Sequence, residues 1–239
     1  MTTKKIISEI FAKYKGTYEA DVLLYAHFPI ALGLRPCAQV QWCDFQPELK
    51  PNTIEKNPET GATILMIWTK DERKLGEQLG LEYIPYWPKL KGQRLLTTRR
   101  YYAVSVANKD LIDLLRNLPD AEEDMEMHGR LHGYPRDCID AFAEDWCYKV
   151  IPDVRASEQI KSVEQKGNKI NTLAYFAGGF VPCKPSCSNA IAIGQNIYNT
   201  YKTFNKEIAR AYLDFTKKHV ADLKNIDLSA THLQIFGGK

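Results

Sequence analysis

The chain has 239 residues, of which 44% are hydrophobic and 26% are charged, and its formal net charge is +3. Such a chain can bury an ordinary core without a metal ion or disulfide to hold it together, so any metal is expected to serve a site. The mild positive charge does not by itself indicate a nucleic acid or a membrane surface as the partner.

The amino-terminal segment MTTKKIISEIFAKYKG places apolar residues at helical spacing between lysines. It lacks the uninterrupted apolar core and the cleavage site of a secretory signal, and no window approaches the roughly 18 apolar residues that cross a bilayer. These features predict a cytoplasmic protein with no membrane segment. Its six cysteines should then be mostly reduced.

The next segments are mostly apolar. Residues 20–34 predict one buried helix or two short helical pieces, within which His27 is expected to be a hydrogen-bonded core residue. Cys37 and Cys43 follow in a predicted strand and would point to the same face. Buried free thiols are the expected state of this pair, and a disulfide or additional metal ligands are the alternatives. A polar loop is predicted over residues 46–61.

A strand–helix pattern occupies the rest of the first half. Strands are predicted at 62–69 and 101–107, and a helix at 70–80 that turns Leu75 and Leu79 inward. A loop is expected at Tyr83 to Trp87, and Asn108 should cap a further helix that Pro119 ends. The pattern indicates a small α/β layer. Neither strand-to-helix junction carries a glycine-rich phosphate loop, which argues against a nucleotide site of that kind.

The second half is predicted to be helical. Helices are expected at 121–131, at 136–148 and, separated by a turn, within 154–175. A long helix from about residue 189 should pack across this half, with a partner helix in a homo-oligomer as the alternative; residues 231–236 could add an edge strand. The long helix carries an apolar stripe of Ile193, Ile197, Tyr201, Phe204, Ile208, Tyr212 and Phe215. The predicted class is α+β, with regions 1–120 and 121–239 packed as one globular unit.

Two segments carry the residue types of a metal site. His128 and His132 stand four apart at the end of a predicted helix, a spacing that zinc helices use, but Gly129 stands where a zinc peptidase has its glutamate. Cys183 and Cys187 form a C-x3-C pair just before a helix, whose amino terminus should lower the thiol pKa. This pair is the stronger of the two signals.

Cys138, near the start of another helix, is the natural third thiolate. Together with one of His128, His132 or Asp137, the three cysteines would complete a tetrahedral zinc site or hold an iron–sulfur cluster. Zinc is favoured because no fourth cysteine has suitable spacing. Inert buried thiols and a disulfide remain open. So do two other functions: a metal-free thiol enzyme or redox protein using Cys187 or Cys138, and an RNA- or protein-binding module with structural cysteines.

The run MHGRLHGYPRDCIDAF and the downstream VPCKPSC resemble the signature of an uncharacterised prokaryotic family, a domain of unknown function common in archaea. The resemblance covers about residues 25 to 195 and implies that the three cysteines belong together. The signature positions would be Gly133, Tyr134, Pro135, Cys138, Cys183 and Cys187. Where that family often has paired cysteines, this chain has Asp137 and Cys138. Either Asp137 substitutes as a ligand, or the first cysteine is not essential.

Overall fold

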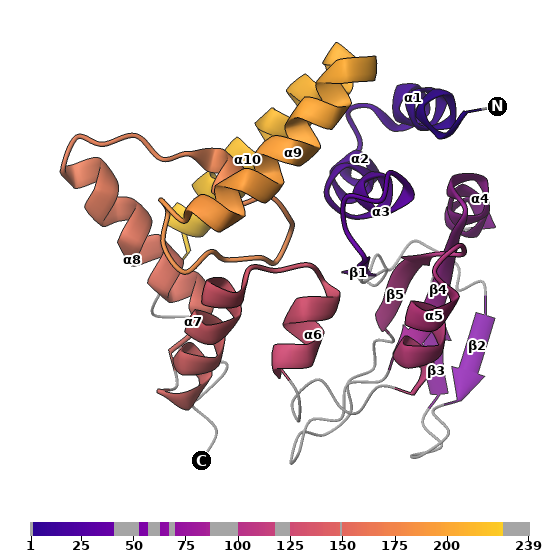
Figure 1. Cartoon of the computed structure of the whole chain (residues 1–239), viewed down its shortest axis with the longest axis horizontal. Coiled ribbons are helices and arrows are strands. Elements are labelled where there is room, and N and C mark those ends of the chain that lie inside the picture. Colours follow the sequence, from indigo (N-terminus) through magenta and orange to yellow (C-terminus); the bar gives the residue numbers. More distant parts are fainter. Residues whose placement is uncertain are drawn as a thin grey trace. The chain divides into compact units, whose positions relative to one another are not determined.

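The structure, a computed structural model, describes residues 2–40, 53–56, 63–66, 70–86, 100–117, 125–148 and 150–226. Backbone contacts divide the chain into two units, Met1–Gly133 and Tyr134–Lys239, and each is described by itself. The first unit holds a small antiparallel sheet with helices, and the described part of the second unit is helical (Figure 1). The predicted α+β class is therefore confirmed.

Several predictions fall outside the described residues and stay predictions. They concern Cys43 and its relation to Cys37, the start of the helix expected from residue 121, and the strand at 231–236. The predicted boundary between regions 1–120 and 121–239 also falls there. In the part of the chain that is described, no helix has the length and apolar character needed to cross a membrane.

The first unit alternates helices with short strands. In chain order its elements are α1 (Thr3–Tyr14), α2 (Tyr18–Val22), the π-helix η1 (Leu23–His27), α3 (Phe28–Ala31), β1 (Cys37–Val40), β2 (Thr53–Lys56), β3 (Thr63–Met66), α4 (Lys70–Leu79), β4 (Leu81–Tyr86), β5 (Arg100–Ser105), α5 (Lys109–Arg116) and α6 (Met125–Leu131). Most of the apolar stretch 20–34 thus lies in one continuous helical run with a π-helical middle, the first of the two predicted alternatives. Leu75 and Leu79 of α4 are buried, and Asn108 caps α5 by accepting the N–H of Leu111.

The sheet of the first unit places β5 between β1 and β4, antiparallel to both. Tyr102 and Val104 of β5 share one face because they are two residues apart, and their register partners are Ile84 and Cys37. These side chains are buried against Leu111, Ile112 and Leu115 of α5. One part of the core of this unit therefore lies between the sheet and α5, and the buried side chains of α1, η1 and α3 form another part.

Strand β4 corrects the prediction of a loop at Tyr83 to Trp87. Pro85 lies inside β4 and is paired with Tyr101 of β5. Because β4 is an edge strand, one row of its backbone N–H groups is not used by the sheet, so a proline is tolerated there. The polar loop predicted over 46–61 is also wrong in part, since β2 pairs with β3 as a two-stranded sheet.

His27 is a core histidine of the first unit, as expected, with 1% of its surface exposed. Its Nδ1 lies 3.4 Å from the carbonyl oxygen of Val22. Burial lowers the pKa of His27 to about 4, and it does the same for His132 and His219. The folded chain therefore keeps these imidazoles neutral well below the pH at which an exposed histidine is protonated.

We expect the metal-free protein to lose stability as the pH falls from about 6.5 to about 4. Over this range the unfolded chain binds protons at its histidines, whereas the folded chain does not, so each proton favours unfolding. A fully buried histidine such as His132 would lower the free energy of unfolding by up to about 3 kcal/mol over this range. Urea unfolding followed by circular dichroism at several pH values measures how steeply the free energy of unfolding falls with pH. His219→Phe should make this dependence shallower, and a flat profile between these pH values would contradict the prediction.

The second unit is helical throughout its described residues. Its elements are α7 (Arg136–Cys147), α8 (Pro152–Gln165), the 3-10 turn η2 (Thr172–Ala174), α9 (Ser188–Phe204) and α10 (Lys206–Lys224). Helix α7 is confirmed as predicted. The helix–turn–helix predicted within 154–175 is half right, because the turn at Gly167, which has a φ of +72°, is followed only by η2.

The single long helix predicted from about residue 189 is wrong, because the chain breaks at Asn205. This residue has an extended backbone, and its side-chain oxygen accepts the N–H groups of Glu207 and Ile208, which caps α10. The two helices then pack against each other (Figure 1). Tyr201 and Tyr212 meet edge to face with ring centroids 5.5 Å apart. The predicted apolar stripe is thus folded onto itself inside the unit.

Gly194 marks a close approach between α9 and η2. A Cβ atom on Gly194 would overlap the carbonyl oxygen of Leu173 and would lie 2.9 Å from the carbonyl carbon. Gly194→Ala should therefore destabilise the protein by about 2 kcal/mol, although alanine is the better helix former. Urea unfolding measures the change, with exposed Ala192→Gly as the reference for helix propensity. A neutral or stabilising Gly194→Ala would contradict this packing.

Candidate metal centre

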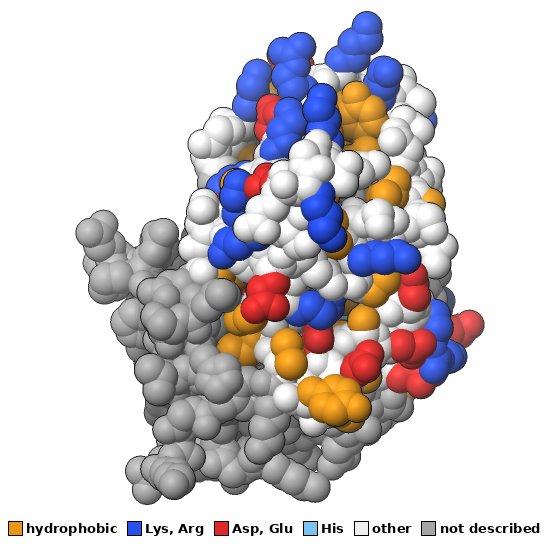
Figure 2. All heavy atoms as spheres, turned by 90° about the vertical axis from the view of Figure 1, so that its left-hand side faces the viewer, with side chains coloured by type: hydrophobic (Ala, Val, Ile, Leu, Met, Phe, Trp, Pro, Cys, Tyr) orange, Lys and Arg blue, Asp and Glu red, His pale blue; other side chains and the backbone are white. Residues whose placement is uncertain are grey.

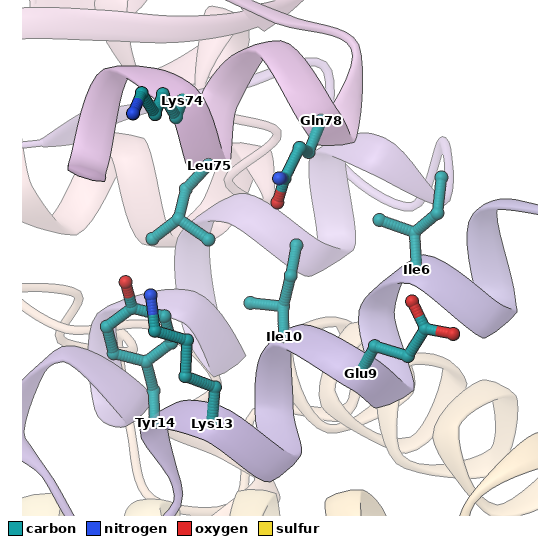
Figure 3. A pocket seen from close by; sticks show the side chains of 8 residues that line it. All are labelled: Ile6, Glu9, Ile10, Lys13, Tyr14, Lys74, Leu75 and Gln78. Carbon is teal, nitrogen blue, oxygen red and sulfur yellow. The ribbon is translucent and has the colours of Figure 1, made fainter. Parts of the chain in front are cut away.

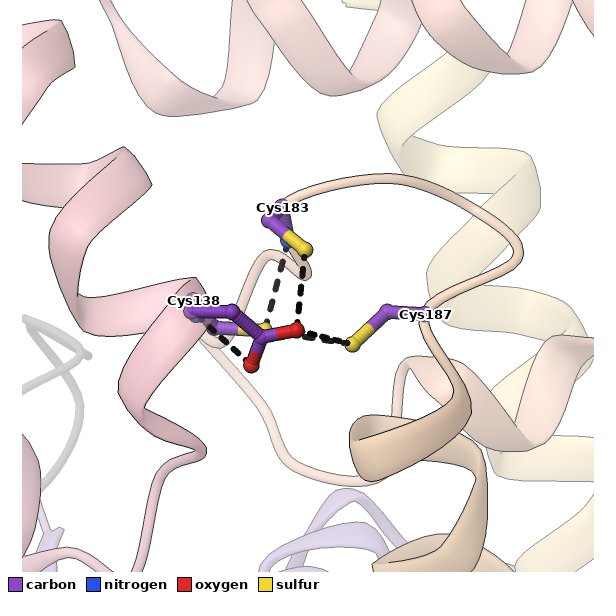
Figure 4. Close-up of side chains that lie close together, drawn as sticks. Cys138, Cys183 and Cys187 are labelled. Carbon is purple, nitrogen blue, oxygen red and sulfur yellow. Dashed lines mark hydrogen bonds between the residues drawn. The ribbon is translucent and has the colours of Figure 1, made fainter.

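Four predicted site residues meet in the second unit. The carboxylate of Asp137 and the thiols of Cys138, Cys183 and Cys187 offer ligand atoms that all lie within 4.8 Å of one another. The Sγ atoms of Cys138 and Cys187 are 3.7 Å apart, and Oδ2 of Asp137 lies 3.2 Å from Sγ of Cys187 and 3.6 Å from Sγ of Cys183. Figure 4 shows the side chains of Cys138, Cys183 and Cys187 lying close together. We call these four residues the thiol–carboxylate cluster.

The break at Gly133-Tyr134-Pro135 places the first two members of the cluster. Gly133 has a φ of +73°, which favours glycine, and α7 begins directly after Pro135. The carbonyl oxygen of Pro135 accepts the N–H of Cys138, and Oδ1 of Asp137 accepts the same N–H at 3.1 Å. Asp137 and Cys138 are consequently held in the first turn of α7, with the carboxylate exposed and the thiol buried.

The loop that carries Cys183 is fastened to α8. Arg155 donates from Nη1 to the carbonyl oxygens of Pro182 and Cys183, at 2.9 and 3.0 Å, and Gln159 donates to the same Cys183 oxygen. The guanidinium is held in turn by Asp145 of α7, whose two carboxylate oxygens accept from Nε at 2.8 and 2.9 Å. This ion pair ties α7, α8 and the Cys183 loop together.

Cys187 is the residue that caps α9. Its Sγ accepts the N–H of Ala190 at 3.4 Å, and the thiol is completely buried. A backbone N–H also points at Sγ of Cys138, from Cys183 at 3.4 Å. Donors directed at sulfur favour the thiolate form, which is the form that binds a metal ion.

Without a metal ion, burial works against the thiolates. It raises the pKa of Cys183 to about 11, helped by the hydrogen bond and charge of Cys187 and by Asp137, and it raises the pKa of Cys138 further. The prediction that the helix start lowers the pKa of the Cys183 thiol is therefore wrong. Burial also acts to raise the pKa of Asp137, but hydrogen bonds from Cys187, Asn189, Cys183 and the Cys138 N–H lower it overall. The carboxylate is thus the charged member of the cluster.

His128 and His132 do not join the thiol–carboxylate cluster. Both are buried in the first unit, where Nδ1 of His128 lies 2.6 Å from the hydroxyl of Tyr102. His132 donates from Nδ1 to the carbonyl oxygen of His128 and accepts the N–H of Gln39 at Nε2, so both of its ring nitrogens are occupied. Each imidazole serves the packing of α6 against the sheet.

The remaining described cysteines are free thiols outside the cluster. Cys37 is completely buried, donates to the carbonyl oxygen of Leu131, and has its pKa raised to about 12 by burial. Cys147 is exposed at the end of α7. Sequence reasoning missed Arg155 and Gln159. Their spacing of four on α8 places them on one helix face, but nothing in that spacing tells which loop the face meets.

A groove of about 440 Å³ lies between α1 and α4 in the first unit (Figure 3). Ile6, Ile10 and Leu75 are its apolar lining residues, and the charged residues Glu9, Lys13 and Lys74 line it as well. Nζ of Lys13 lies 4.9 Å from the ring centroid of Tyr14, a cation–π contact. The groove therefore combines apolar lining residues with charges of both signs.

Charged side chains of both signs lie on one face of the molecule. Figure 2 shows Lys and Arg side chains gathered over the upper part of this face, while most of the Asp and Glu side chains lie below them. Some of the exposed charges are paired, such as Lys217 with Asp214 and Arg136 with Asp140. Paired charges and the presence of both signs on one face are typical of a solvated surface and do not by themselves indicate RNA binding.

Fold and site together define an α+β protein with a cysteine-rich candidate metal centre. Residues 95–211 match the family model of DUF483, a protein family of unknown function. The predicted resemblance to an uncharacterised family is confirmed over these residues, which include the whole thiol–carboxylate cluster. No curated protein and no solved structure is detectably similar to the chain.

Proposed function

We propose that this protein binds one zinc ion through the thiolates of Cys138, Cys183 and Cys187 and the carboxylate of Asp137. The observation that carries the proposal is the distance between the ligand atoms. A tetrahedral zinc ion, with bonds of about 2.3 Å to sulfur and 2.0 Å to oxygen, holds two sulfurs about 3.8 Å apart and sulfur and oxygen about 3.5 Å apart. The corresponding distances here are 3.7 Å, and 3.2 and 3.6 Å.

Zinc is favoured over an iron–sulfur cluster on two grounds. Such clusters are usually held by four thiolates, and the thiol–carboxylate cluster offers three. In a 4Fe–4S cluster each ligand also binds a different iron atom, so these ligands stand farther apart than ligands that share one ion. A single zinc ion accepts mixed sulfur and oxygen ligands and tolerates this spacing.

Binding of zinc would exchange protons for the ion. The pKa of Cys183, at about 11, leaves this thiol protonated at neutral pH in the metal-free protein, and the pKa of Cys138 is raised as well. Zinc would displace these protons and the S–H···O contacts to Asp137, so that all three sulfurs bind as thiolates. The Cys183 loop and the start of α7 would then be joined through the ion.

Metal analysis of protein purified without oxygen tests the proposal. We expect about one equivalent of zinc and no visible absorption. Iron with sulfide and a brown colour would mean that the site holds an iron–sulfur cluster and not zinc. Less than about one-tenth equivalent of any transition metal would contradict a metal centre. Two accompanying proposals have their own tests. Fractionation of the source cells tests whether the protein is cytoplasmic, and light scattering of the purified protein tests whether it forms a homo-oligomer.

A metal-free thiol-redox protein is the second candidate, and the 3.7 Å between the Sγ atoms of Cys138 and Cys187 favours it. A small movement would bring these atoms to bonding distance. The raised pKa of Cys138 opposes it, because the thiolate is the reactive form. Alkylation of metal-free protein across pH separates the two: a cluster thiol that reacts well below the ordinary pKa near 8.5 supports redox chemistry.

A further inference from the structure

We propose that the metal centre is of the catalytic kind, in which Asp137 is an exchangeable ligand that a small anion, hydroxide included, replaces on the ion. This inference rests on the proposed zinc site and adds a role to it. Structural zinc sites are closed by four permanent protein ligands, whereas catalytic sites keep three and leave a position open. The arguments are the burial, the hydrogen bonding and the electrostatic surroundings of the four ligands.

The ligand set is asymmetric in its access to solvent. Cys138 and Cys187 are 2% and 0% exposed, and Cys183 is half-buried. Asp137 is exposed, and it is the only ligand of the four that is. A molecule from solvent therefore reaches the ion from the side of the carboxylate, while the three sulfurs form the protein side of the coordination shell.

The carboxylate also has partners that remain when it leaves the ion. Its Oδ1 accepts the N–H of Cys138, and the side chain of Asn189 hydrogen-bonds to it as well. A displaced Asp137 would keep these contacts at the exposed surface, so displacement leaves no buried charge unpaired. The thiolates have no such alternative, since Cys138 and Cys187 would be left as buried anions.

The surroundings favour an anion in the vacated position. Helices α7 and α9 both begin at the cluster, with Asp137 in the first turn of α7 and Cys187 as the cap of α9. The positive ends of two helix dipoles therefore point at the ion and stabilise negative charge there. Exchange breaks one metal–oxygen bond to Asp137 and forms one bond to the incoming anion, with no change in oxidation state.

Cobalt(II)-substituted protein provides the test, because the visible d–d bands of cobalt report its ligands. We expect azide to shift these bands saturably in the wild-type protein. Asp137→Cys, which closes the site with a fourth thiolate, should abolish the shift. Asp137→Ala, which removes the competing carboxylate, should bind azide at least about tenfold more tightly, a difference of about 1.4 kcal/mol.

The outcomes separate this inference from the proposed function. If cobalt binds in one equivalent and azide leaves the bands unchanged, the centre is closed and the inference is wrong while the metal site stands. An equal azide shift in Asp137→Cys would show that the anion enters elsewhere, which also overturns it. If neither zinc nor cobalt binds the wild-type protein, the proposed function falls and this inference with it.

Discussion

Replacing Cys138 by serine is expected to lower the zinc affinity of the protein by roughly 10²- to 10³-fold. Zinc bound by four protein ligands gains on the order of 10–16 kcal/mol in small domains, so one ligand carries about 3–4 kcal/mol of it. Serine keeps the size of the side chain but does not ionise at neutral pH, so it replaces the thiolate poorly. Competition with a chromogenic chelator measures the change.

Cys147→Ser is the matched control, because Cys147 lies on the same helix as Cys138 but is exposed and outside the cluster. It should leave zinc affinity unchanged. Cys183→Ser and Cys187→Ser should follow Cys138→Ser. Circular dichroism of each metal-free variant checks that the fold is retained. Equal affinity in Cys138→Ser and Cys147→Ser, with both folded, would remove Cys138 from the metal site.

Arg155→Met should destabilise the metal-free protein by about 3–5 kcal/mol, because it leaves the carboxylate of Asp145 buried without its partner. The two side chains are 16% and 7% exposed, and their shortest contact is 2.8 Å. The substitution also removes the donors that hold the carbonyl oxygens of Pro182 and Cys183. We therefore expect zinc affinity to fall by about 10- to 100-fold as well.

Lys217→Met provides the comparison for this ion pair. Lys217 pairs with Asp214 at 3.0 Å, but both side chains are more than half exposed, so its loss should cost less than about 1 kcal/mol. Arg155→Lys separates charge from geometry, since lysine keeps the charge but cannot reach Asp145 and both carbonyls in the same way. If Arg155→Met destabilised the protein no more than Lys217→Met, the ion pair would not be what fastens the Cys183 loop.

The cluster residues could be predicted because their residue types and their positions at helix starts depend on neighbours in the sequence. The Gly133-Tyr134-Pro135 break ends one helix and starts another, which sets Asp137 and Cys138 in a first turn. Cys183 and Cys187 lie just before α9, and the start of this helix is likewise set by neighbouring residues in the sequence. Hydrophobic periodicity likewise predicts α4, α5 and α7, because each helix buries one face.

The edge strand β4 and the break at Asn205 could not be predicted from local pattern. A proline in a segment predicts a loop there, unless it is known that the segment is a strand at the edge of a sheet. Asn205 interrupts an apolar stripe that continues in register on both sides, so the periodicity alone predicts one helix. The pairing of Tyr201 with Tyr212 is visible only after the chain has turned back.

The sequence by itself determined the residue types of the site, the helix starts that hold them and the α+β class, because each depends on neighbours a few positions away. The tertiary structure decided which fourth residue joins the three thiols: Asp137 does, while His128 and His132 are engaged by Tyr102 and Gln39. It also decided that Arg155 supports the Cys183 loop. Such choices depend on contacts between segments far apart in the chain, which local pattern and spacing do not encode.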